Sequence, residues 1–151
     1  MKSDRPKVGV GAYIFNDGKV LMAERLNANH ANHTFAAPGG HVEFGETWGE
    51  AAMREAKEET GLTTANPRFI GITNDVWADE RKHYITIAVA LDYVGGEPQI
   101  MEPEKSMAWK WLTLDEVKNL DPKMVSLENF LDGEFADNLV QEIEKSKGNK
   151  R

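Results

Sequence analysis

The segment that decides the fold is GHVEFGETWGEAAMREAKEETGL, residues 40–62. Its centre predicts a helix over Trp48–Thr60. Thr47 and Glu50 form a Thr-x-x-Glu capping box at the start, and Gly61 stands where helices commonly end in a left-handed residue. The segment therefore joins a sharply bounded helix to a high density of negative charge. Its six glutamates are Glu43, Glu46, Glu50, Glu55, Glu58 and Glu59.

Helical periodicity predicts that part of this charge faces inward, although a glutamate-rich helix usually presents a solvated face. At about 100° per residue, Glu55 and Glu59 share one side of the helix with its best packing residues. A helix that packs through this side points both carboxylates inward or to the rim of a cleft. The packing residues are Trp48, Ala51 and Ala52, and the opposite side carries Glu50, Met53, Lys57 and Thr60.

Inward-facing carboxylates need a compensating charge. Arg54 and Lys57 cannot neutralise three acids within one turn from the far side of the helix, whereas a divalent cation can. All-oxygen ligands favour Mg²⁺ or Mn²⁺ over zinc, and Mg²⁺ commonly completes its shell with waters and substrate phosphates. The sequence therefore predicts a metal-dependent enzyme that acts on a phosphate compound.

Composition narrows the class of protein. The chain has 151 residues, 40% hydrophobic and 28% charged, so one folded domain over residues 1–151 is expected. A net charge of −7 disfavours nucleic acid or an anionic membrane as partner. The lack of cysteine excludes a disulfide framework, a thiolate zinc site and a cysteine nucleophile. Residues 1–7 are polar and no apolar run approaches the roughly 18 residues of a membrane helix, so a cytoplasmic protein is expected.

The order of the other predicted elements indicates a mixed α/β protein with helices on both faces of a sheet. Asn16-Asp17-Gly18 predicts a hairpin turn, and residues 26–34 and 97–106 predict loops. A second capping box begins at Thr113, and the helical tail is expected to break near Gly133. Strands are predicted at residues 8–15, 19–25, 41–44, 67–77, 83–94 and 108–112, and the helical tail at 126–147.

Residues 40–62 match the Nudix box without a gap, which ends in the run Arg-Glu-U-x-Glu-Glu-x-Gly-U, where U is a bulky apolar residue. Leu62 fills the last U, and Ala56 is smaller than the pattern prefers. The chain therefore resembles the Nudix hydrolase superfamily. The resemblance implies an α/β/α sandwich with a mixed β-sheet, and Mg²⁺-dependent hydrolysis of a nucleoside diphosphate linked to another group. The fixed positions are Gly40, Glu46, Arg54, Glu55, Glu58, Glu59 and Gly61.

The resemblance also implies a role for single residues. Glu55, Glu58 and Glu59 are expected to bind the metal, with the carbonyl of Gly39 as an added ligand. The metal is expected to be Mg²⁺, with Mn²⁺ as the substitute. It would neutralise the diphosphate oxygens and lower the pKa of a bound water.

Further residues complete the expected site. Glu46 is expected just beyond the metal ligands, and Arg54 is expected to orient the glutamates through salt bridges. The base toward the attacking water is either one of the metal-binding glutamates or a loop acid such as Glu104. Arg25 ends a strand where related proteins carry a phosphate-contacting arginine, and Thr86 is a candidate contact to the base or sugar; a surface arginine and a strand-forming threonine are the alternatives.

Three separated segments are similar to a MutT-type subgroup, the 8-oxo-dGTP and thioguanine-nucleotide diphosphatases. They are residues 35–48, the strand His83-Tyr84-Ile85-Thr86-Ile87, and Glu102-Pro103-Glu104-Lys105 before Trp109-Lys110-Trp111. The subgroup implies that a nucleoside triphosphate, including oxidised or non-standard ones, is cleaved to the monophosphate and pyrophosphate. It also implies a homodimer.

Other functions stay open. Within the superfamily, ADP-ribose, a nucleotide sugar, a dinucleotide or dihydroneopterin triphosphate are alternative substrates. A Nudix-fold binding module without turnover is disfavoured, because such modules usually lose box glutamates and this box keeps all of them. His41 and His83 are candidates to line the nucleotide pocket, whereas Trp48 and Trp77 are expected to pack rather than to stack on a base.

Overall fold

The computed structural model describes residues 4–25, 34–104 and 106–149, so the loop predicted at 26–34 lies, apart from Thr34, outside the described residues. Strands in the described part form a mixed sheet in the order β3-β2-β1-β6-β5, with β4 paired to β1 and β7 to β2. Strands β1 and β6 are parallel, and the other pairs are antiparallel. The strands are β1 Lys7–Asn16, β2 Lys19–Arg25, β3 Phe35–Ala36, β4 Gly39–His41, β5 Thr63–Trp77, β6 Lys82–Gly95 and β7 Ser106–Leu112.

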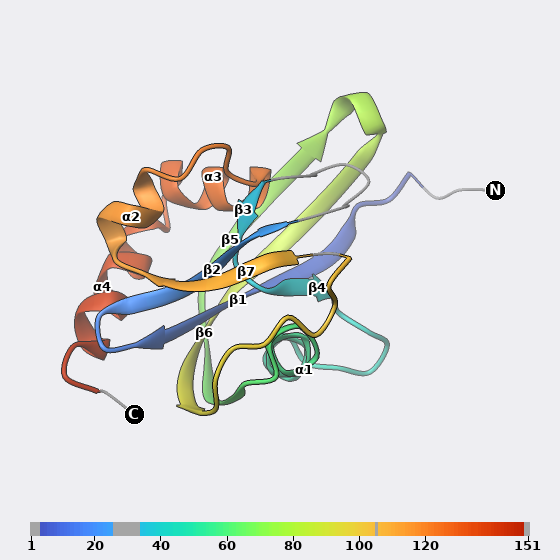
Figure 1. Cartoon of the computed structure of the whole chain (residues 1–151). Coiled ribbons are helices and arrows are strands. Elements are labelled where there is room, and N and C mark those ends of the chain that lie inside the picture. The colour runs from blue at the N-terminus through green and yellow to red at the C-terminus, as the bar shows by residue number, and fades with distance from the viewer. Residues whose placement is uncertain (1–3, 26–33, 105, 150–151) are drawn as a thin grey trace.

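Helices cover both faces of this sheet (Figure 1). One face packs on α1 through Ala51, Ala52 and Ala56, which are fully buried. The other face packs on the remaining helices through side chains such as Phe130 and Leu139. The expected α/β sandwich with a mixed sheet is therefore confirmed. The helices are α1 Trp48–Thr60, the 3-10 turn η1 Ala78–Glu80, α2 Leu114–Lys118, α3 Val125–Asp132 and α4 Ala136–Ser146.

Strand β1 changes partner along its length, so that β1 and β2 are paired at one end only. Its last residues, Phe15 and Asn16, pair with β2. Its first half pairs instead with β4, where Gly9 lies opposite His41 and Gly11 opposite Gly39. Between these two pairings, the backbone amide of Ala12 donates to the carbonyl of Pro38 at 2.7 Å. The chain thus turns away from β2 beside the glycines of β4, next to the start of the box.

Several boundaries differ from the sequence prediction. The strand expected at 41–44 lies instead at Gly39–His41, because two glycines let the chain approach β1 closely. A turn follows, in which the amide of Glu46 donates to the carbonyl of Glu43. Strand β5 begins at Thr63 rather than at residue 67, because the pairing with β6 shifts register around Pro67 and so accommodates it.

The packing of α1 also differs in two residues. Trp48 was expected on the buried side, but it is exposed and packs edge-on against Phe69 with ring centroids 6.3 Å apart. Thr60 was expected on the opposite side, yet it is fully buried and its hydroxyl donates to the carbonyl of Ala56 at 2.6 Å. The buried stripe is therefore rotated toward Ala56 and Thr60, away from Trp48.

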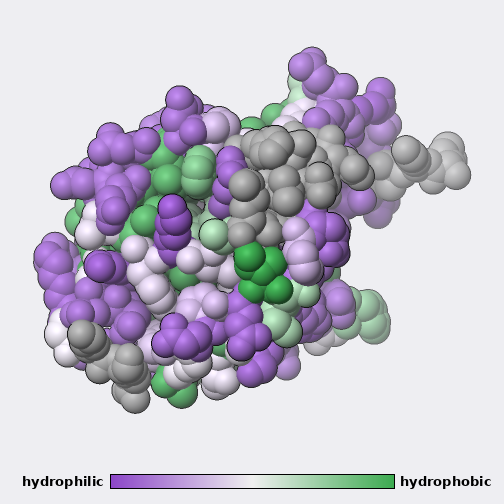
Figure 2. All heavy atoms as spheres, viewed as in Figure 1, coloured by the Kyte–Doolittle hydropathy of each residue, from purple (hydrophilic) through white to green (hydrophobic). Residues whose placement is uncertain are grey.

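The face of the molecule seen in Figure 2 is largely hydrophilic. Figure 2 shows hydrophilic residues over much of the face in view, with apolar residues gathered in smaller areas between them. Among the helices of the described residues, none has both the length and the apolar character that a membrane crossing requires.

Candidate active site

The ends of α1 fix where its acids stand. The Thr47 hydroxyl accepts from the amide of Glu50 at 3.1 Å, and the Glu50 carboxylate accepts from the amide of Thr47 at 2.9 Å. Gly61 has φ +79° and its amide donates to the carbonyl of Lys57 at 2.9 Å. Both predicted caps are confirmed. Glu50 is thus committed to the helix end, and the other glutamates of α1 remain for the site.

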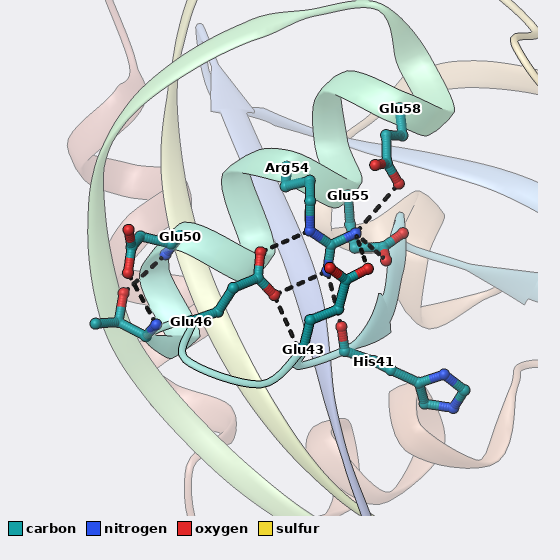
Figure 3. A network of polar contacts seen from close by, with 8 residues as sticks. His41, Glu43, Glu46, Glu50, Arg54, Glu55 and Glu58 are labelled. Carbon is teal, nitrogen blue, oxygen red and sulfur yellow. Dashed lines mark hydrogen bonds and ion pairs between the residues drawn. The ribbon is translucent and has the colours of Figure 1, made fainter.

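Arg54 gathers the acids of the box around one guanidinium group (Figure 3). Its Nε and Nη2 donate to the two carboxylate oxygens of Glu46 at 2.6 and 2.9 Å. Its Nη1 donates to Glu55 at 2.9 Å and to Glu58 at 3.2 Å, while Nη2 also donates to the carbonyl of His41 at 2.9 Å. The fork of the arginine thereby joins the loop before α1 to the acidic side of the helix.

This contact fixes the charge of Glu46. The hydrogen bonds from Arg54, together with that from the amide of Glu43, lower the pKa of the Glu46 carboxyl from 4.5 to about 2. In turn, the carboxylates of Glu46 and Glu55 raise the pKa of Arg54 further above its usual value. Glu46 is therefore ionised at neutral pH, and both of its carboxylate oxygens are bound to Arg54. Such a residue orients its neighbours rather than binding a ligand itself.

Glu55 lies deepest among the acids that contact Arg54, with its side chain 14% exposed. Burial raises the pKa of its carboxyl, and the hydrogen bond from Arg54 acts in the opposite direction. The carboxyl lies against the Cα of Gly40, where an added Cβ would stand 2.4 Å from the carboxyl carbon. Gly40 is therefore required by the close approach of Glu55.

Glu59 and Glu58 differ in their surroundings. The Glu59 carboxylate accepts from the amide of Gly39 at 3.1 Å and lines the same cavity as Glu55. The Glu58 side chain is 54% exposed, is held by Arg54 and is not among the cavity-lining residues. Across residues 4–25, 34–104 and 106–149, no three acidic or histidine side chains already surround one point that fits a metal ion.

The cavity beside these acids has a volume of 320 Å³. One part of its lining, called the acidic end from here on, consists of the glycines of β4 and the acids Glu43, Glu55, Glu59 and Glu102. Among the described residues that line the cavity there is no lysine or arginine. Arg54 pairs with Glu43 and Glu55 from outside the lining, so the acids keep an excess of negative charge, and a cation would favour the binding of an anionic ligand here.

The other end of the cavity is aromatic and weakly polar. The rings of His41 and Tyr84 stack with centroids 5.5 Å apart, and Trp77 meets Tyr84 edge-on at 5.8 Å. All three side chains line the cavity, and Trp77 packs against Tyr84 as expected. Thr86 lines this end as well, and it pairs with Gly9 of β1. A planar ring can pack here while its phosphates reach the acidic end.

Other predicted residues fall elsewhere. Arg25 ends β2 as predicted, but its side chain lies outside the described part of the chain. His83 contacts Asn74 with 2.7 Å between its Nε2 and the amide oxygen, and it does not line the cavity. Glu104 is exposed, whereas Glu102 of the same loop lines the cavity.

Asp75 is the polar residue that the sequence analysis overlooked. It is fully buried in β5 and accepts hydrogen bonds from Thr73, Thr86 and Asn129. A single aspartate between strand-forming residues was the only available signal, because its partner Asn129 is 54 positions away in α3.

Comparison with known proteins agrees with the geometry. The Nudix domain pattern matches residues 5–132. The chain is 45% identical over 92 residues to a protein of Methanocaldococcus jannaschii named ADP-ribose pyrophosphatase, covering 61% of this chain and 54% of that protein. It is 30% identical over 109 residues to the NAD-capped RNA hydrolase NudC of Vibrio atlanticus, covering 72% of this chain and 38% of that protein. The chain thus spans about half or less of the length of these relatives.

Solved structures share the fold. A MutT NUDIX hydrolase from Burkholderia pseudomallei is similar with a TM-score of 0.73 and 28% identity, covering 83% of this chain and 98% of that one. The NUDIX domain of NrtR from Shewanella oneidensis, solved with ADP ribose, has a TM-score of 0.69 at 16% identity, covering 96% of this chain and 89% of that one. The second likeness concerns the fold alone.

Proposed function

Because this chain belongs to the Nudix domain family, we propose that it hydrolyses a diphosphate linkage in a nucleotide with the help of a divalent cation. The observation that carries the proposal is a cavity whose lining combines two unlike groups of side chains. Carboxylates of Glu55 and Glu59 bound one end, and the rings of Trp77 and Tyr84 bound the other. A nucleotide has the same division, with charge at one end and a planar base at the other.

The residues present suit a divalent cation. The buried carboxyl of Glu55 and the carboxylate of Glu59 are hard oxygen donors on the same cavity wall, and the backbone of Gly39 lies beside Glu59. Glu58 would join them by leaving Arg54, which keeps Glu46 as its partner. A bound Mg²⁺ would neutralise diphosphate oxygens and make a bound water more acidic. Arg54 would keep its contacts with Glu46 and Glu55.

A carboxylate that accepts the proton of the attacking water must also reach the cavity. Glu102 meets this condition, and its charge contributes to the raised pKa of Glu55. Its loop is tied to the end of α1, since the amide of Gln99 donates to the carbonyl of Thr60 at 2.8 Å. We therefore place Glu102, rather than Glu104, first among the loop acids as general base.

ADP-ribose is the first substrate to test, because a relative with 45% identity bears the name ADP-ribose pyrophosphatase. Water would then cleave the linkage to give AMP and ribose 5-phosphate. The second candidate is a nucleoside triphosphate, including 8-oxo-dGTP, cleaved to the monophosphate and pyrophosphate. It is favoured by the 28% identical MutT structure and by the sequence segments that are similar to triphosphate diphosphatases.

A substrate panel in Mg²⁺ tests the proposal. The panel holds ADP-ribose, the common NTPs and dNTPs, 8-oxo-dGTP, a nucleotide sugar and dihydroneopterin triphosphate, and AMP, pyrophosphate and phosphate are measured separately. Cleavage of a diphosphate linkage that stops in EDTA is expected, with ADP-ribose turned over fastest. Pyrophosphate release from triphosphates alone would move the chain to the second candidate. Lack of product from every compound would overturn the proposed hydrolase.

A further inference from the structure

At the aromatic end of the cavity, the hydroxyl of Thr86 is oriented by a side chain that lies outside the cavity lining. Thr86 lines the cavity, and its Oγ1 donates to Oδ2 of Asp75 at 2.5 Å. Asp75 itself is fully buried and does not line the cavity. Because Thr73 pairs with Thr86 across β5 and β6, Asp75 lies one pleat further on the same face. The carboxylate therefore lies beside the threonine on that face, outside the lining of the cavity.

The hydrogen bonds around Asp75 all run toward it. Thr73 donates to Oδ2 at 3.1 Å, and Nδ2 of Asn129 donates to Oδ1 at 2.9 Å. Both carboxyl oxygens of Asp75 thus accept hydrogen bonds, and the three donors compensate the burial of this side chain. The single hydrogen of the Thr86 hydroxyl is consequently directed at Asp75, and only its lone pairs remain for the cavity.

We infer that Asp75 fixes Thr86 as a hydrogen-bond acceptor, so that the aromatic end of the cavity selects a nucleotide base that offers an N–H donor. This inference rests on the proposed function, because it assigns that end of the cavity to the base of the nucleotide. Asp75 is a positioning residue that acts through Thr86. Adenine and guanine carry such donors on their amino or ring nitrogens, whereas unsubstituted purine presents only acceptors there.

Because of the position of Asn129, the inference can be tested by replacing one carboxyl oxygen of Asp75 with an amide nitrogen. Its Nδ2 donates to the carbonyl of Asn74 at 3.2 Å as well as to Asp75, so its amide orientation is fixed. In Asp75→Asn, the new amide must turn its oxygen toward Asn129 and its NH₂ toward Thr86. The Thr86 hydroxyl then accepts a hydrogen bond from this NH₂ group and directs its own hydrogen into the cavity. The substitution would thereby change the Thr86 hydroxyl from a hydrogen-bond acceptor into a donor toward the ligand.

The experiment compares binding of AMP, GMP and purine riboside 5′-monophosphate by calorimetry in Mg²⁺. These ligands contain no diphosphate linkage, so the result is independent of turnover. We expect the wild-type protein to bind the better of AMP and GMP about three- to tenfold more tightly than the donor-free purine nucleotide, as for one neutral hydrogen bond. Thr86→Val should bring this ratio close to one, Thr86→Ser should retain it, and Asp75→Asn should bring it to one or below.

Thr73→Val is the matched control. It removes a hydroxyl from the same Asp75 oxygen, but Thr73 does not line the cavity, so the wild-type ratio should persist. Thermal unfolding identifies variants that fail to fold, and the Thr86 pair decides the question if Asp75→Asn does so. The inference is overturned if the wild-type protein does not prefer a donor-bearing purine, or if folded Thr86→Val keeps the preference. If the binding pattern holds while the substrate panel yields no product, the proposed hydrolysis fails and the base preference stands.

Discussion

Gly40 and Glu55 approach each other more closely than any other residue type at position 40 would allow. A Cβ atom added to Gly40 would stand 2.4 Å from both the carboxyl carbon and one carboxyl oxygen of Glu55. Gly39 is equally crowded, but there the nearest atom is the backbone carbonyl oxygen of Val10 at 2.3 Å. A side chain added at Gly40 would thus meet the end of another side chain, whereas one added at Gly39 would meet the backbone of β1.

Substituting these glycines should separate activity from stability. Gly40→Ala is expected to keep its fold, because the Glu55 carboxyl can move, but to lose at least about tenfold in turnover as that carboxyl leaves its place. Gly39→Ala should unfold at a clearly lower temperature, because the backbone of β1 cannot yield. Thermal unfolding and initial rates on the best substrate measure both, with Gly95→Ala, where a Cβ meets nothing within 4 Å, as the control. A fully active Gly40→Ala would contradict the placement of Glu55.

Neutralising the acids of α1 should stop turnover without unfolding the protein. Glu58→Gln and Glu59→Gln remove a charge but keep the shape, and each is expected to lower kcat by at least about a hundredfold. Stability should change little for Glu58→Gln, because an exposed ion pair contributes about 0–1 kcal/mol. Glu50→Gln is the control on the same helix, since glutamine also completes a capping box. Near-normal rates in both test variants would remove the metal assignment.

The pH dependence of stability should reveal the contact between Glu46 and Arg54. The pKa of Glu46 falls from 4.5 to about 2 on folding, so its contribution is complete above pH 4.5 and is lost as the pH falls toward 2. The difference in Tm between the wild-type protein and Glu46→Gln should therefore be largest above pH 4.5 and shrink below it. A difference that stays constant from pH 6 to pH 2.5 would show that the charge of Glu46 does not stabilise the fold.

The two acids of the loop before β7 should differ in importance. Glu102→Gln is expected to lower kcat by about 10²–10⁴-fold, as for the loss of a general base, because Glu102 lines the cavity. Glu104→Gln should behave as the wild-type protein, because Glu104 is exposed and does not line the cavity. Rates measured between pH 6 and pH 10 on the best substrate test both. The opposite ranking would return the role to Glu104.

Local signals in the sequence determined much of this fold. The capping box of Thr47 and Glu50 and the glycine at position 61 set both ends of α1, and the turn at Asp17-Gly18 set the first hairpin. Each of these depends on residues within four positions of one another, so pattern and structure coincide. The spacing of the acids likewise predicted that Glu55 and Glu59 point inward.

Long-range pairing accounts for what the sequence did not reveal. The short strand before α1 was placed two residues late, because its bounds depend on pairing with Gly9 and Gly11 some thirty residues earlier. Trp77 packs as expected, but the sequence did not reveal that pairing of β5 with β6 brings it to Tyr84 in the cavity lining. Asp75 could not be recognised as a partner of Thr86 before the register of these strands was known.

The central claim is that the acidic end of the cavity binds a divalent cation, and metal titration tests it most directly. Mn²⁺ added to the wild-type protein should lose its free-ion signal in electron paramagnetic resonance, and Mg²⁺ should restore that signal by competition. Glu59→Gln should weaken binding by about ten- to a hundredfold, whereas Glu50→Gln should bind as the wild-type protein does. Mn²⁺ that stays free in the presence of the wild-type protein and AMP, or that binds Glu59→Gln equally well, would contradict the account.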